Sequence, residues 1–192
     1  MYSPPDGEPM KPLEICKHLG RERVDGYYGE LSGKEVRAVL KAGGVASSVP
    51  ETAFTRAARL KAWRRKFDNE FDGGNEQLGL ALLIEWLMRH HRSMLVDFLD
   101  HLEVPHKQGE TDEDFCETRT PEQLRAGIDV LMKKYPAHHV ATYLLLVGHL
   151  QESGVFDQTP SLLVALGMDE EAAEAYVEDH KRTWKPKAKG AA

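Results

Sequence analysis

The chain has 192 residues, of which 41% are hydrophobic and 29% charged, as in an ordinary soluble globular protein. A chain of this length can bury enough apolar surface to fold without disulfides or a structural metal. Its two cysteines, Cys16 and Cys116, are far apart in sequence, which excludes a disulfide framework and a paired-cysteine zinc motif and favours a reducing compartment. The net charge of −6 disfavours binding to nucleic acid unless a local basic patch outweighs it.

Residues 1–10 have neither a basic nor an apolar segment, so we expect them to be disordered and not to be a signal peptide. Beyond them, apolar residues recur at helical spacing, and no segment alternates with the period of a strand. Residues 21–31, which contain two glycines and two tyrosines, and the acidic stretch 109–119 are expected to be loops. The expected helices, in chain order, are 12–19, 32–42, 51–71, 75–102, 120–134, 137–152, 159–166 and 169–183.

Capping signals mark several of these helix starts. In a capping box, a Ser or Thr is followed three residues later by Glu or Gln, and each side chain accepts a hydrogen bond from the other residue's backbone N–H. The sequence contains three such pairs at expected helix starts: Ser32 with Glu35, Ser48 with Glu51, and Thr120 with Gln123. Asn75 and Asp169 are expected to cap two further helices.

Two stretches, 78–88 and 140–150, are apolar on every face of a helix. Helices of this kind lie at the centre of a fold, whereas 124–132 has an apolar stripe on one side only. Both central stretches are too short to span a bilayer, which needs about 20 residues. The predicted fold is therefore all-α: a compact multi-helix bundle of about seven to nine helices with two apolar central helices. We expect no membrane segment and a cytoplasmic location.

The balance of charge changes near the Gly-Gly pair at 73–74, since residues 1–72 carry a net charge of +2 and residues 73–192 a net charge of −8. This change suggests a domain boundary, although an ordinary turn between helices would look the same. The predicted segments are a disordered start (1–10), an N-terminal helical arm or subdomain (11–72), a main helical bundle (73–184) and a disordered basic tail (185–192).

The expected helix 51–71 is rich in basic residues and is the candidate for binding nucleic acid. It follows a shorter helix across a Gly-Gly turn, loosely as in a helix-turn-helix. A helical wheel, however, divides the cations between two sides, and acids follow them, which favours a solvated helix over one that reads a groove. The candidate nucleic-acid-binding residues are Arg56, Arg59, Lys61, Arg64 and Arg65.

Nine histidines raise the alternative of a metal site. Asp97 and His101 are four residues apart, so on one helix both could bind the same ion. A third ligand would have to be His106, His138 or His139. The helix 75–102 is either continuous or breaks near 90–93, and the alignment of His90 with Asp97 and His101 depends on which is true.

The sequence contains no recognisable catalytic or cofactor-binding motif. It has no G-x-S-x-G, no P-loop, no G-x-G-x-x-G and no HExxH, and we expect no cofactor. The leading hypothesis is a non-enzymatic protein-interaction or regulatory module whose partner is another protein. One alternative is a nucleic-acid-binding protein using helix 51–71, and a second is a metal-binding or enzymatic protein using dispersed His and Asp residues. The oligomeric state is left open.

Overall fold

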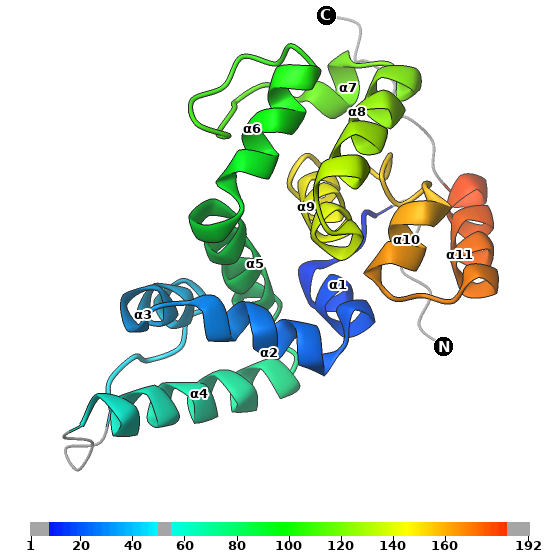
Figure 1. The fold of residues 1–192 in the computed structure, drawn as a ribbon. Helices are drawn as coiled ribbons and strands as arrows, with labels where there is room; N and C mark the ends of the chain where they lie inside the picture. The colour runs from blue at the N-terminus through cyan, green and yellow to red at the C-terminus, as the bar shows by residue number, and fades with distance from the viewer. Residues whose placement is uncertain (1–7, 50–54, 184–192) are drawn as a thin grey trace, which may run out of the picture. The chain divides into compact units, whose positions relative to one another are not determined.

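The computed structural model describes residues 8–49 and 55–183, and every regular element in these residues is a helix (Figure 1). The all-α prediction is confirmed. The predicted number of seven to nine helices is too low, because the described residues form eleven. These are α1 (Pro12–Leu19), α2 (Arg21–Glu30), α3 (Gly33–Ala42), α4 (Arg56–Asp72), α5 (Glu76–His90), α6 (Arg92–His101), α7 (Phe115–Thr118), α8 (Pro121–Lys134), α9 (Ala137–Leu150), α10 (Pro160–Leu166) and α11 (Glu170–Thr183).

Helix α2 replaces the loop predicted at 21–31. Its buried residues, Val24, Tyr27 and Tyr28, follow the i, i+3, i+4 spacing of one helix face. Gly26 and Gly29 are exposed, with open space where a side chain would be. Each glycine costs the helix roughly 1 kcal/mol relative to alanine, and the packing of the two tyrosines outweighs that cost.

The expected helix 75–102 is broken at His91, where α5 ends and α6 begins. The backbone of His91 has φ −128° and ψ 23°, which is outside the helical region. His90 is therefore not on the same continuous helix as Asp97 and His101. The acidic stretch 109–119 is also not entirely a loop, since Asp114 caps the short helix α7 by accepting from the N–H of Glu117.

Two of the three predicted capping boxes are confirmed, those at the starts of α3 and α8. The predicted box at Ser48 and Glu51 is not tested, because Glu51 lies in the range 50–54, outside the described residues. Helix α4, as described, begins at Arg56, and the side chain of Thr55 accepts from the N–H of Ala58. No described helix has the length and apolar content needed to cross a bilayer.

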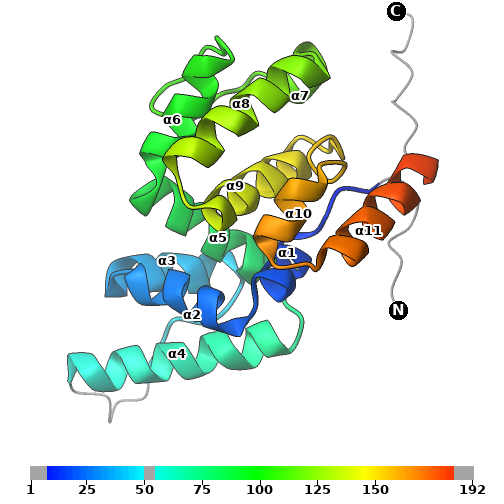
Figure 2. The ribbon, with the colours of Figure 1, turned by 45° about the vertical axis from the view of Figure 1, so that its right-hand side comes forward.

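Residues 11–113 form one compact unit, here called the N-terminal unit, which contains α1 to α6. Helix α5 lies at its centre and packs against the other five helices. Its residues Leu82, Leu83 and Trp86 are fully buried. The ring of Tyr27 from α2 stacks on Trp86 with 3.6 Å between ring centroids. Figures 1 and 2 both show α4 lying below α2 and α3 within this unit.

The described residues among 1–10 and 114–192 form a second compact unit, here called the C-terminal unit. Its central helix is α9, which packs against α8 and α10 and is buried over most of its length (Figure 2). Met10 is buried in this unit, and its N–H donates to Asp157 at 3.2 Å. Each unit thus has one apolar central helix. The predicted domain boundary near 72–74 stays a prediction. The predicted basic tail, 185–192, lies outside the described residues.

Candidate interaction surface

Helix α4 is anchored to the N-terminal unit by its aromatic residues. Phe67 is fully buried and Trp63 is 9% exposed. The indole Nε1 of Trp63 donates to the carbonyl of Ser47 at 2.9 Å. Three residues further along, the ammonium of Lys66 donates to the carbonyls of Ala46 and Ser48 at 2.7 and 2.6 Å. Trp63 and Lys66 therefore hold the segment that follows α3 against α4.

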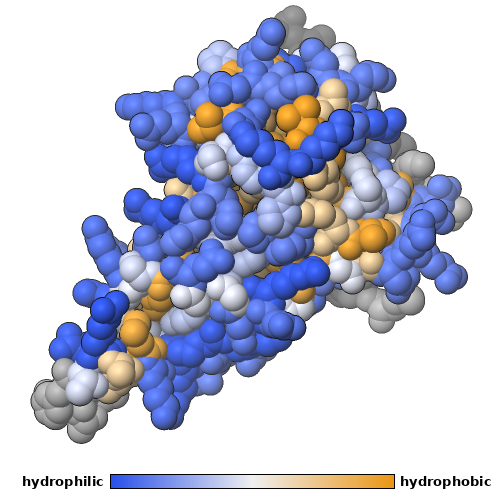
Figure 3. Space-filling view, viewed as in Figure 1, coloured by the Kyte–Doolittle hydropathy of each residue, from blue (hydrophilic) through white to orange (hydrophobic). Residues whose placement is uncertain are grey.

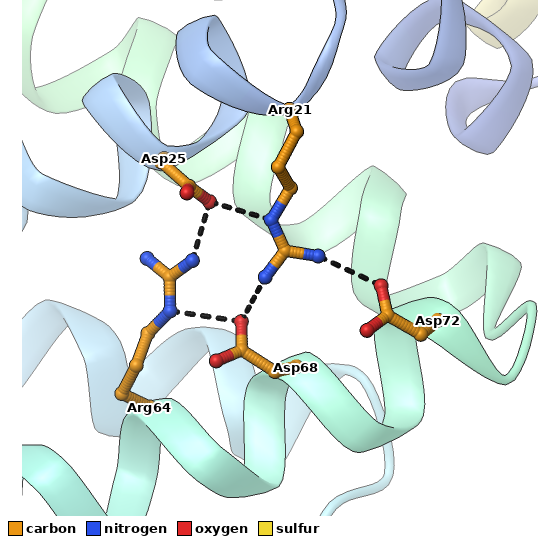
Figure 4. A network of polar contacts seen from close by, with 5 residues as sticks. All are labelled: Arg21, Asp25, Arg64, Asp68 and Asp72. Carbon is orange, nitrogen blue, oxygen red and sulfur yellow. Dashed lines mark hydrogen bonds and ion pairs between the residues drawn. The ribbon is translucent and has the colours of Figure 1, made fainter.

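A second set of contacts joins α4 to α2 through alternating arginines and aspartates (Figure 4). Arg64 donates to Asp68 at 2.8 Å and also to Asp25. Arg21 donates to Asp25 at 2.8 Å, to Asp72 at 2.7 Å and also to Asp68. We call these five residues the arginine–aspartate network. Both arginines bridge carboxylates on two different helices, so the network fixes the position of α4 beside α2.

The environment of Arg64 shows that its charge serves the fold. Its guanidinium lies over the ring of Tyr28, 4.7 Å from the centroid, and its side chain is only 27% exposed. Burial opposes ionisation of Asp25, but the hydrogen bond and charge of Arg64, together with Arg21, outweigh burial and lower the pKa of Asp25. Burial also raises the pKa of Tyr28 to about 12, although the charge of Arg64 acts in the opposite direction.

Other cations on α3 and α4 are in a different situation. Lys34, Arg37 and Lys41 of α3 and Arg56, Lys61 and Arg65 of α4 are all exposed. Within the described part of the chain, the side chains of these six residues form no hydrogen bond or ion pair. We call the six residues the basic surface. Figure 3 shows that the face of the molecule over α4 is hydrophilic along its lower edge.

The basic surface lies in a short segment of high positive charge. Residues 33–66 hold nine lysines and arginines against two glutamates, in a chain whose net charge is −6. The charges of α4 also oppose its dipole, because the helix begins with the cation Arg56 and ends with the acid Asp72. Asp68 and Asp72 near its C-terminal end are explained by the network. Among the described residues, Arg56 and Lys61 in its first half have no such explanation.

The structure separates the residues predicted to bind nucleic acid. Arg64 belongs to the arginine–aspartate network, whereas Arg56, Lys61 and Arg65 belong to the basic surface, and Arg59 is exposed on α4. Sequence reasoning missed the three cations of α3. Their i, i+3, i+7 spacing, which places them on one side of a helix, was the available signal.

The candidate metal ligands belong to two units. Asp97, His101 and His106 are in the N-terminal unit, while His138 and His139 are in the first turn of α9 in the C-terminal unit. His106 Nε2 lies 3.0 Å from Asp100, and His106 Nδ1 accepts from the N–H of Gly109 at 3.1 Å. Among the described residues, no three His, Cys, Asp or Glu side chains are grouped so that they could hold a metal ion.

A further polar cluster joins α2 to the junction of α5 and α6. Glu30 accepts from the indole Nε1 of Trp86 at 2.8 Å, and His91 Nε2 lies 3.7 Å from the same carboxylate. Burial lowers the pKa of His91, although the charge of Glu30 acts in the opposite direction. Glu30 thus gives the buried indole a hydrogen-bond partner at the helix break, which is a structural role.

Both cysteines are free thiols, and Cys16 is buried. Burial raises the pKa of each thiol to about 12, so neither is activated as a nucleophile. The basic surface therefore remains as a group of charged side chains without a hydrogen bond or ion pair among the described residues.

No protein-family model, curated protein or solved structure matches the chain.

Proposed function

We propose that the chain is a non-enzymatic protein-interaction module that contacts its partner through the basic surface. The observation that carries the proposal is the presence of six exposed cations without hydrogen bonds or ion pairs in the described part of an acidic chain. A cytoplasmic setting belongs to the proposal, since two free thiols suit a reducing compartment.

The isolated fold gains little from these cations. Like charges three or four residues apart on a helix, such as Lys61 and Arg65, repel each other by roughly 0.2–0.5 kcal/mol. Cations near the N-terminal end of a helix, such as Arg56, are also opposed by the helix dipole. An anionic partner would add attractions that offset both unfavourable terms. By contrast, Arg21 and Arg64 already have their anionic partners inside the N-terminal unit.

Nucleic acid is a less well supported partner than protein. Two basic side chains of α4, those of Arg64 and Lys66, are used within the fold. Trp63 and Phe67 are buried, and so cannot stack on bases as the aromatics of single-strand-binding proteins do. The metal-binding or enzymatic alternative stays a prediction that no grouping of described residues supports.

The test is purification of the tagged full chain from its native source at low salt, followed by lysine-directed cross-linking. A partner protein is expected in stoichiometric amount, cross-linked at Lys34, Lys41 or Lys61. A variant with these three lysines and the three arginines of the basic surface changed to Gln should lose it. Retention of nucleic acid alone, or of a protein that the variant binds equally well, would contradict the proposal.

A further inference from the structure

We infer that the partner docks on the basic surface through a short acidic segment, with its carboxylates facing the cations of α3 and α4. This inference rests on the proposed function and adds to it the chemistry of the partner. Its first support is charge complementarity, because residues 33–66 contain the two glutamates Glu35 and Glu51 among nine cations. Glu35 is already engaged, since its carboxylate accepts from the N–H of Ser32.

Five of the six cations form two rows, whereas Arg56, at the start of α4, lies on the opposite side of that helix from Arg65. Lys34, Arg37 and Lys41 share one side of α3 and extend for about 10 Å along its axis. Lys61 and Arg65 form a shorter row of about 6 Å on α4. The guanidinium of Arg37 lies 5.9 Å from the ring centroid of Trp63, so the α3 row adjoins α4 at that residue.

Small side chains lie beside each row of cations. Ala38 and Ala42 on α3 are exposed, and Ala58 and Ala62 on α4 are half-buried. Alanine side chains leave room for the backbone of a partner to come close enough for its carboxylates to reach the flanking cations. Lysine and arginine stems can then cover the partner's apolar atoms.

The length of the positive segment favours a short acidic segment over a nucleic acid. The α3 row extends for about 10 Å and the α4 row for about 6 Å, and on each helix the cations of the basic surface lie within about 15 Å. Outside residues 33–66 the chain holds 16 lysines and arginines against 29 aspartates and glutamates. A long polyanion would extend over this acidic remainder, whereas an acidic segment of about ten residues can be confined to the basic surface.

The experiment is fluorescence anisotropy of the full chain with a fluorescein-labelled peptide of about twelve residues, containing glutamates spaced i, i+3 and i+7 among alanines. The control peptide has Gln in place of Glu, and labelled DNA of similar length, single- and double-stranded, is measured in parallel. The test variant is Lys34→Gln/Arg37→Gln/Lys41→Gln. The matched control removes three exposed cations elsewhere, as Lys17→Gln/Arg125→Gln/Lys133→Gln.

We expect saturable binding of the acidic peptide, no binding of the Gln peptide, and an affinity that falls about tenfold in the test variant but about twofold or less in the control. Raising NaCl from about 50 mM to about 500 mM should weaken binding, because exposed charges are screened. Equal loss in both variants, tighter binding of DNA than of peptide, or no binding of the peptide would overturn the inference.

The acidic peptide is also added as a competitor to the captured partner. Displacement of the partner supports the inference. If cross-links place the partner on the basic surface and the acidic peptide does not displace it, the inference fails while the proposed function stands. If no captured protein depends on the basic surface, the proposed function itself fails.

Discussion

Arg64 and Arg65 are adjacent arginines on α4 that the structure places in opposite roles. Arg64→Gln removes hydrogen bonds to Asp25 and Asp68 and the contact with the ring of Tyr28. Two partly exposed ion pairs contribute roughly 0.2–1 kcal/mol each, and a cation–π contact contributes about 0.5–1 kcal/mol. We therefore expect Arg64→Gln to lower the free energy of unfolding by about 1–3 kcal/mol. Arg65→Gln should change it by about 0.5 kcal/mol or less.

The assay is urea unfolding followed by tryptophan fluorescence. Replacing Trp184 by Phe in every variant leaves Trp63 and Trp86, both in the N-terminal unit, as the reporters. At about 1 M NaCl the effect of Arg64→Gln should shrink, because its ion pairs are partly exposed. In the peptide-binding assay the order should reverse, with Arg65→Gln the more damaging. If Arg65→Gln destabilises the chain as much as Arg64→Gln, the distinction between structural and surface cations is refuted.

Four further predictions concern the fold. Gly43→Ala should destabilise the chain by roughly 1–3 kcal/mol in urea unfolding, because its Cβ would lie 2.7 Å from Leu78 Cδ1 and 2.9 Å from Leu78 Cα; Gly26→Ala, in open space on α2, should stabilise it by about 0.5–1 kcal/mol. Asp25→Asn should be less stable than the native chain at neutral pH. Because the pKa of Asp25 is lowered by folding, its stabilisation is lost as pH falls, so that difference should narrow below about pH 4 in acid titrations of stability. Cys16 should react with iodoacetamide at pH 8 only after unfolding, and rapid labelling of the folded chain by mass spectrometry would contradict its burial.

Features that depend on neighbours in sequence could be predicted. The caps at Ser32 and Thr120 need only a side chain and a backbone three residues away, and both are present in the structure. The loop predicted at 21–31 was wrong because the glycines of α2 were weighed without knowing that Tyr27 and Tyr28 have buried partners. Those partners, Trp86 and Phe67, come from helices more than thirty residues away.

The same limit applies to the candidate surface. The sequence drew attention to the basic helix, but it could not show that Arg64 is bonded to Asp25, 39 residues earlier in the chain. The helical wheel does separate Arg64 from Arg65, but it does not show that Arg64 has carboxylate partners within the fold. The cations of α3 have a visible helical spacing, but only the structure shows that no described side chain pairs with them.

The most direct test of the basic surface is the affinity of the full chain for its cross-linked partner, measured by titration calorimetry with three proteins. These are the native chain, Lys34→Gln/Arg37→Gln/Lys41→Gln, and the control Lys17→Gln/Arg125→Gln/Lys133→Gln. We predict a loss of about tenfold or more for the first variant and about twofold or less for the control. Equal affinities for all three proteins would contradict the claim that the cations of α3 and α4 form the docking surface.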